Sequence, residues 1–273
     1  MFQSPDDRHF LVDFNDGLLR LTLNRPEYGN AMPPTAVPGL LALFRAAQAN
    51  PAVRCIMMDG NGKIFCAGGD VGGFGKSLEQ EPAVRQASFA ERLAGLGSLV
   101  EAVASFDRPF VVAVRGAVAG AGLLYPLIAD YVLADGTAAF AFAHQRVGLS
   151  PDGGVSYFLP QVVGVRTART LLLTAAKIDA AEALRLGILS RIVPAEQLEG
   201  EFVAAARRFA AAPQRAVVAA KRLVNHAGSR SLGEQLKEEG DSIVACVGDP
   251  DFEEGVKAFL EKRRANFPSA RIS

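Results

Sequence analysis

The sequence is short of residues on which several classes of protein depend. Its three cysteines, Cys55, Cys66 and Cys246, are odd in number and far apart, so they indicate neither a disulfide framework nor a metal site. Lysine plus arginine and aspartate plus glutamate number 29 each, which leaves a formal net charge of zero. That balance gives no support to a nucleic-acid partner. Tryptophan is absent altogether.

Long hydrophobic runs are also missing. Residues 123–129 form one of the longest apolar stretches, which is far shorter than the roughly 20 residues that a helix needs to cross a bilayer. Residues 1–9 are polar and lack the apolar core of a signal peptide. We therefore expect a cytoplasmic protein with no membrane partner.

Short apolar runs separated by turn signals predict a sheet near the N-terminus. Residues 10–14 and 18–23 flank Asn15-Asp16-Gly17, which is a hairpin signature. Residues 53–58 predict another strand. Residues 110–114 are almost entirely apolar, as expected of a strand in a sheet that is covered on both faces.

Helical patterns alternate with these strands and then dominate. Residues 81–106 predict a long amphipathic helix, and the chain beyond Pro151 is mostly helical. We therefore expect an α/β core over residues 1–195, followed by a helical region over residues 196–273.

Glycine is concentrated in two segments that follow predicted strands. Five glycines occur within residues 68–75, and three occur within residues 115–122. Glycine loses more backbone entropy on folding than any other residue, so this density favours loops in which backbone N–H groups approach a ligand. A flexible turn and a tight strand–helix connection are the alternatives. The Gly-x-Gly-x-x-Gly spacing of dinucleotide-binding loops is absent from the second segment.

Several short motifs occur in a set order from about residue 10 to residue 267. They include Phe65-Cys-Ala-Gly-Gly-Asp70, Gly116-x-x-x-Gly120-Ala-Gly122 with Asp130 beyond it, Leu23-Asn-Arg-Pro-Glu27, and Gly148-Leu-x-Pro-Asp152-Gly-Gly154. This ordered set resembles the crotonase (enoyl-CoA hydratase/isomerase) superfamily. The resemblance implies a spiral of ββα units with a C-terminal helical trimerisation region, assembled as a homotrimer or a dimer of trimers.

The resemblance also implies an acyl-CoA thioester as substrate and no cofactor or metal besides. Its shared chemistry is stabilisation of a thioester enolate by two backbone N–H groups, which map onto Gly69 and Ala121. Such donors act at about 3 Å from the oxygen that gains charge, and one of them can contribute roughly 3 kcal/mol. We expect Asp70 to fix the glycine loop by accepting backbone hydrogen bonds, with a chemical role as the alternative, and we expect the helix over residues 81–106 to line the acyl pocket.

The acid–base positions are where this chain departs from hydratases of that superfamily. Those enzymes use two glutamates, and the matching positions here hold Leu124 and His144, with Ala143 before the histidine. A leucine can neither orient water nor move a proton. Histidine takes up and releases protons at neutral pH, so His144 is a candidate catalytic group. The alternative is a histidine packed in its loop.

Asp152 is the second candidate acid–base residue. By resemblance, some isomerases of the superfamily use an aspartate in this loop to move a proton along the acyl chain, and a 4-chlorobenzoyl-CoA dehalogenase uses one as a nucleophile. The absence of tryptophan, and Leu96 and Gly97 in place of the dehalogenase histidine, argue against dehalogenation. A turn residue that caps the helix at Val155 is the structural alternative.

The sequence therefore predicts isomerase-type proton transfer by Asp152. The alternatives are a hydratase that uses His144 and a noncatalytic CoA-binding homologue. For CoA itself, the resemblance points to Ala67, Phe259 and Lys262. Arg25 is a further candidate, because Gly29 replaces a common basic residue of the family, although a solvated surface charge would explain Arg25 as well.

Overall fold

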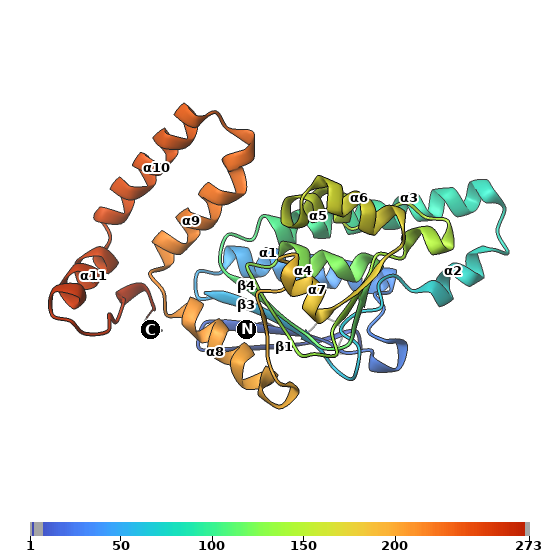
Figure 1. Cartoon of the computed structure of the whole chain (residues 1–273), viewed down its shortest axis with the longest axis horizontal. Coiled ribbons are helices and arrows are strands. Elements are labelled where there is room, and N and C mark those ends of the chain that lie inside the picture. Colours follow the sequence, from blue (N-terminus) through green and yellow to red (C-terminus); the bar gives the residue numbers. More distant parts are fainter. Residues whose placement is uncertain (1, 3–7, 271–273) are drawn as a thin grey trace.

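A computed structural model describes residue 2 and residues 8–270. Within this part of the chain the main sheet has the order β1-β2-β3-β4-β6-β9 (Figure 1). Its strands are β1 (Phe10–Asn15), β2 (Leu18–Leu23), β3 (Cys55–Gly60), β4 (Phe110–Val114), β6 (Tyr131–Ala134) and β9 (Arg191–Ile192). The predicted hairpin is confirmed: β1 and β2 are antiparallel, and Asn15 pairs with Leu18. The other neighbours in this sheet are parallel.

The structure also contains a second, smaller sheet that the sequence did not predict. It contains β5 (Ala117–Ala119), β7 (Ala139–Ala141) and β8 (Lys177–Asp179) in that order. Each of these strands is three residues long, and the first two are made mostly of alanine, so no hydrophobic alternation marks them. The segment that the sequence indicated as a small-residue turn therefore contains a strand.

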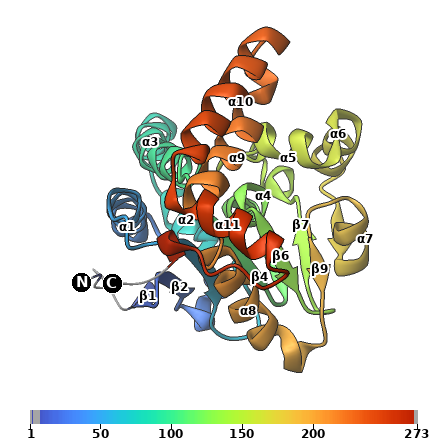
Figure 2. The same ribbon diagram turned by 90° about the vertical axis from the view of Figure 1, so that its left-hand side faces the viewer.

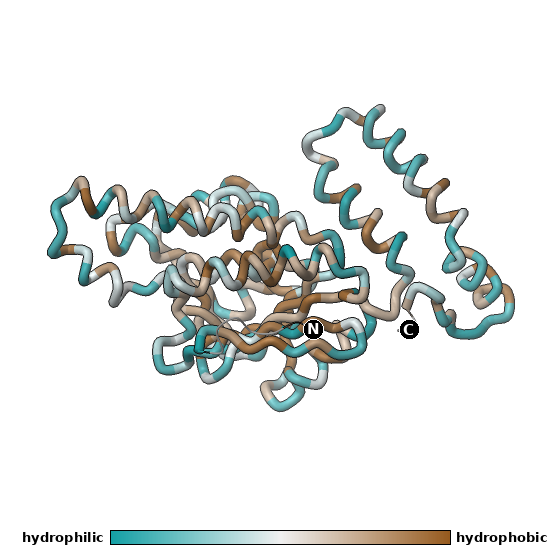
Figure 3. Tube along the Cα trace, turned by 180° about the vertical axis from the view of Figure 1, so that it is seen from behind, coloured by the Kyte–Doolittle hydropathy of each residue, from teal (hydrophilic) through white to brown (hydrophobic). Residues whose placement is uncertain are grey.

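The central strands bury both of their faces. Met58 and Val112 belong to a core that α1 (Val37–Ala49) and α3 (Pro82–Ala104) cover, while Met57 and Val111 face Phe202 on the other side. Phe202 lies on α8 (Leu198–Ala210). Alternate residues of a strand point to opposite faces, so two cores require an apolar strand without alternation, as predicted for β4. Figure 3 shows this apolar concentration in the sheet.

The remaining helices extend this architecture. They are α2 (Val71–Ser77), α4 (Leu124–Ile128), α5 (Val155–Val163), α6 (Val165–Leu173), α7 (Ala180–Arg185), α9 (Gln214–His226), α10 (Leu232–Val247) and α11 (Pro250–Leu260). Helices α9, α10 and α11 form an arm that projects from the body (Figures 1 and 2). Although α8 falls in the predicted C-terminal region, it packs on the sheet. None of the described helices is long and apolar enough to cross a membrane.

The turn between β4 and β5 accepts only glycine. Gly116 has φ +64°, and a Cβ there would lie 1.9 Å from the carbonyl oxygen of Lys63. We expect Gly116→Ala to lower the free energy of unfolding by about 2 kcal/mol or more, because both the backbone conformation and the contact are unfavourable to a side chain.

The matched control is Gly97→Ala, in the interior of α3. A Cβ at Gly97 meets nothing within 4 Å, so this variant should be more stable by roughly 0.5–1 kcal/mol. Urea denaturation followed by circular dichroism measures both changes. Equal stability of the two variants would contradict the packing described for Gly116.

Candidate active site

A cavity of about 520 Å³ brings five of the predicted site residues together. Gly69, Ala121, His144 and Asp152 all line it, and so does Ala67. They come from segments far apart in the sequence: the loop before α2, the turn before α4, and the loop between β7 and α5.

The first glycine segment is held by hydrogen bonds and does not form a loose turn. The Met32 N–H donates to the Gly68 carbonyl oxygen at 2.8 Å. The Asp70 carboxylate accepts from the Gly73 N–H at 3.1 Å and caps α2. This confirms that Asp70 fixes the loop, and it explains why a glycine-rich run continues as a helix. In the described chain, the Gly69 N–H donates to no backbone carbonyl.

The second segment lies directly against the first. The Cys66 N–H donates to Ala117 O at 3.2 Å, and the Ala119 N–H donates to Cys66 O at 2.9 Å. A Cβ at Gly68, which has φ +94°, would lie only 2.6 Å from Ala119 O. The two segments therefore approach each other at a distance that a side chain at Gly68 would prevent.

Ala121 lies in the first turn of a 3-10 helix, Gly120–Leu123, that leads into α4. The first N–H groups of a helix have no intrahelical acceptor, so the Ala121 N–H can donate into the cavity. A Cβ built on Gly120 would lie 3.9 Å from the Gly69 nitrogen and 4.0 Å from His144 Nε2. The two amide-bearing segments and the imidazole thus surround one small volume.

His144 and Asp152 contact each other across this volume. His144 Nε2 is 3.1 Å from Asp152 Oδ1. The imidazole is buried, with 8% of its side chain exposed, whereas 36% of the Asp152 side chain is exposed. An ionised carboxylate only accepts hydrogen bonds, so an imidazole that pairs with it carries a hydrogen on Nε2. His144 Nδ1 is buried and has no partner among the described residues.

The structural alternative for Asp152 is not observed. The N-cap residue of α5 is Gly154, and no side chain caps that helix. The Val155 N–H donates to the main-chain carbonyl oxygen of Asp152, at 3.1 Å. The Asp152 carboxylate is therefore not used by the helix and is directed to His144.

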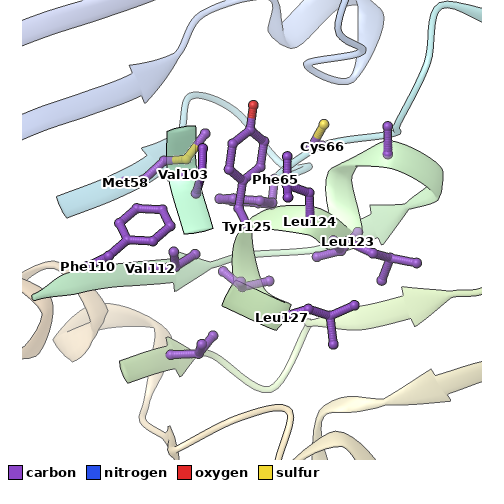
Figure 4. Packing of buried hydrophobic residues seen from close by; sticks show 14 of the residues in the cluster. Met58, Phe65, Cys66, Val103, Phe110, Val112, Leu123, Leu124, Tyr125 and Leu127 are labelled. Carbon is purple, nitrogen blue, oxygen red and sulfur yellow. The ribbon is translucent and has the colours of Figure 1, made fainter. Parts of the chain in front are cut away.

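The position of Leu124 confirms that this site lacks the two-glutamate arrangement of hydratases. It is fully buried and belongs to the main hydrophobic core, among Phe65, Leu123 and Tyr125 (Figure 4). It is not among the residues that line the cavity. The helix that follows the Ala121 turn therefore contributes no acid–base group at this position.

Cys66 lies close to both segments but is not a nucleophile. It is fully buried, and its thiol donates to the Asn30 carbonyl oxygen at 3.3 Å. Burial raises the pKa of Cys66 to about 11, an effect that a backbone hydrogen bond from Gly68 partly offsets. A thiol that stays protonated at neutral pH is unreactive.

The candidate CoA-binding residues are dispersed. Arg25 donates to the Ala31 carbonyl oxygen at 2.8 Å, and its guanidinium lies 4.5 Å from the centre of the Tyr28 ring. Phe259 and Lys262 are exposed, at and just beyond the C-terminal end of α11 in the arm, and neither lines the cavity. Within this chain, only Ala67 of the four lies beside the candidate active site.

Several residues that line the cavity were not among the predicted site residues. Phe89, Arg92 and Leu93 of α3 line it, together with Phe74 of α2 and Arg146. The long helix was expected to line an acyl pocket, and its position agrees with that expectation. Phe89, Leu93 and Leu96 are spaced as one face of a helix, so the amphipathic pattern is in line with the face that meets the cavity.

Comparison with known proteins identifies the family. The enoyl-CoA hydratase/isomerase family model matches residues 13–270. The chain belongs to the enoyl-CoA hydratase/isomerase family. A "Probable enoyl-CoA hydratase" of Rhodobacter capsulatus is 36% identical over 256 residues, which are 93% of this chain and 96% of the relative. A 1,2-epoxyphenylacetyl-CoA isomerase of Escherichia coli is 32% identical over 252 residues, 92% of this chain and 95% of the relative.

Solved structures of this enoyl-CoA hydratase/isomerase family confirm the crotonase-type α/β fold. An enoyl-CoA hydratase from Polaromonas superposes with a TM-score of 0.85 at 32% identity, covering 94% of this chain and 98% of that one. The chain is therefore a crotonase-type enzyme. The relatives carry the names of two different reactions, so their names alone do not fix the reaction here.

Gly68→Ala tests whether the close approach of the two segments matters for activity. We expect it to lower kcat on an acyl-CoA substrate by about 100-fold or more, because a Cβ would push the Gly69 amide away from the Ala121 turn. The control is Gly75→Ala in α2, where a Cβ meets nothing within 4 Å. Loss of activity in both variants, or in neither, would contradict this role for Gly68.

Proposed function

We propose that the enzyme is an acyl-CoA isomerase in which Asp152 moves a proton along the acyl chain. The observation that carries the proposal is the 3.1 Å contact between Asp152 Oδ1 and His144 Nε2, in a cavity that Gly69 and Ala121 also line. The family relationship supports an acyl-CoA thioester as substrate. Beyond the CoA portion of that substrate, the proposal needs neither a cofactor nor a metal.

In this mechanism the thioester carbonyl oxygen lies between the N–H groups of Gly69 and Ala121. The Asp152 carboxylate removes a proton from a carbon of the acyl chain, and the electron pair left behind delocalises onto the carbonyl oxygen. The two N–H groups stabilise that negative charge. Asp152 then returns the proton to a different carbon, so the double bond migrates and water is neither added nor lost.

His144 positions the carboxylate. Its Nε2–H donates to Asp152 Oδ1 before the proton moves, and buried Phe142 anchors the chain just before it. Two aspartates line the cavity, but the Asp70 carboxylate already accepts from Gly73. The Asp70 carboxylate caps α2, whereas the Asp152 carboxylate caps no helix and contacts the imidazole of His144, so Asp152 is the carboxylate proposed to exchange a proton with the substrate, which suits a mechanism with a single base.

A hydratase that uses His144 is the second candidate. The buried, unpartnered Nδ1 of His144 favours it, because that nitrogen could accept a hydrogen bond from a water molecule. The relative from Rhodobacter capsulatus that is named as a hydratase is in line with this reading. The buried Leu124 weighs against it, because the second water-activating group of a two-carboxylate site is missing. A noncatalytic CoA-binding homologue is disfavoured by the His144–Asp152 pair.

We also propose that the chain assembles as a homotrimer or a dimer of trimers. Ile243 and Val244 on α10, and Phe259 and Leu260 on α11, are each at least 67% exposed. An apolar surface of this kind favours burial against another copy of the chain. In that assembly Phe259 and Lys262 would reach the CoA of a neighbouring subunit.

Asp152→Asn tests the isomerase. The variant preserves the size of the side chain and an acceptor for His144, but an amide cannot take up the proton. We expect kcat for double-bond migration to fall by roughly two to four orders of magnitude while acyl-CoA binding persists. The control is Asp70→Asn, because asparagine caps a helix as well as aspartate does. Unchanged turnover by Asp152→Asn would refute the assignment of Asp152.

His144→Ala separates the isomerase from the hydratase. If the isomerase is correct, wild-type enzyme adds no water to crotonyl-CoA, and the variant slows migration without abolishing it. Hydration is measured by the loss of absorbance of the conjugated thioester. Water addition by the wild type that disappears in His144→Ala would favour the hydratase.

A further inference from the structure

A cation lines the cavity of the candidate active site, on the long helix α3. Arg92 on α3 lines the cavity and is half-buried. Its guanidinium carbon lies 5.4 Å from the centre of the Phe89 ring. Among the described residues, no carboxylate forms an ion pair with it. An acyl chain made of hydrocarbon alone would form no ion pair or hydrogen bond with this guanidinium.

A row of contacts connects Arg92 to the proposed thioester site. A Cβ at Gly69 would lie 3.0 Å from Cζ of Phe74. The Phe74 and Phe89 rings are 5.1 Å apart between centroids and tilted at 46°. Arg92 lies over the second of these rings. The row therefore forms an aromatic wall that begins beside the proposed enolate site and ends at a guanidinium.

The other charged groups that line the cavity already have partners in the protein. Arg146 donates to the Ala175 carbonyl oxygen at 3.0 Å. Asp70 accepts from the Gly73 N–H at 3.1 Å, and Asp152 contacts His144. Arg92 differs from them because its contact is the face of a ring, which leaves its N–H groups available.

The surroundings of Arg92 strengthen its attraction for an anion. The cavity that Arg92 lines has many apolar lining residues, Val37, Leu93 and Leu96 among them. A charge in such surroundings is costly unless it is paired, and a guanidinium stacked on a ring presents a planar edge that fits a carboxylate bidentately. An acyl group with a carboxylate at its far end would pair with it.

We propose that Arg92 binds a terminal carboxylate of the acyl group, so that the enzyme prefers acyl-CoAs derived from dicarboxylic acids. This inference rests on the proposed function only in placing the thioester at Gly69 and Ala121. The aromatic wall would pack against the methylene carbons, and Arg92 would select the charge at the end of the chain. Arg92 is a specificity residue in this scheme and takes no part in proton transfer.

The test uses binding and does not depend on turnover. Dissociation constants are measured by isothermal titration calorimetry for saturated ligand pairs of equal length: butyryl- and succinyl-CoA, hexanoyl- and adipoyl-CoA, and octanoyl- and suberoyl-CoA. We expect wild-type enzyme to bind the dicarboxylic member of at least one pair about tenfold more tightly. The preference should disappear in Arg92→Met and survive in part in Arg92→Lys, which keeps the charge.

The control variant is Arg85→Met, on the same helix but outside the cavity lining, which should keep the full preference. Asp152→Asn should keep it too, so a failure of the isomerase mechanism would not imitate a failure of this inference. Equal or weaker binding of every dicarboxylic ligand by the wild type would overturn the proposal. So would an equal loss of affinity for both members of a pair in Arg92→Met, because that result would place Arg92 against a CoA phosphate.

Discussion

The candidate active site depends on how closely two backbone segments approach each other. The loop at Gly68 and the strand end at Ala119 are so close that a Cβ at Gly68 would lie 2.6 Å from the Ala119 carbonyl oxygen. Hydrogen bonds between Cys66 and both Ala117 and Ala119 hold the two segments together. This packing is what brings the Gly69 and Ala121 amides to the same cavity. Because the proposed donors are main-chain groups, the side chains around them can vary without removing the donors.

The reaction then depends on which side chains face that cavity. Leu124 belongs to the core, so the helix after the Ala121 turn offers no proton-transfer group at that position. His144 and Asp152 face the cavity from one loop and contact each other. A single carboxylate held by an imidazole suits a proton that leaves one carbon and returns to another. Hydration would need a second group to hold water.

Local signals in the sequence predicted the parts of the fold that local physics determines. Asp16 and Gly17 adopt φ of 51° and 76°, as a two-residue hairpin turn requires, and the turn could be recognised for that reason. The helix α2 was not predicted, because Gly72, Gly73 and Gly75 disfavour a helix and outweigh the local signal of Asp70 as a helix cap. The short strands β5 and β7 depend on pairing partners that their alanines do not specify.

The same distinction between local signals and tertiary contacts applies to the candidate site. The order of the motifs identified Gly69, Ala121, His144 and Asp152, and the structure places all four around one cavity. The contact between His144 and Asp152 depends on how the intervening loop folds back, which spacing alone does not determine. Arg92 was missed because a single cation on a long helix is most simply explained as a solvated side chain, although Arg92 shares a helix face with Phe89 and Leu96.

The central claim is that the enzyme moves a proton within the acyl chain and adds no water. Mass spectrometry of a panel of enoyl-CoAs, incubated with wild-type enzyme in deuterium oxide, tests it most directly. The account predicts a product whose double bond has moved, with no mass gain from water, and with deuterium at Cα or Cγ to the extent that the proton held by the partly exposed Asp152 exchanges with solvent. A product that has gained the mass of water would contradict it.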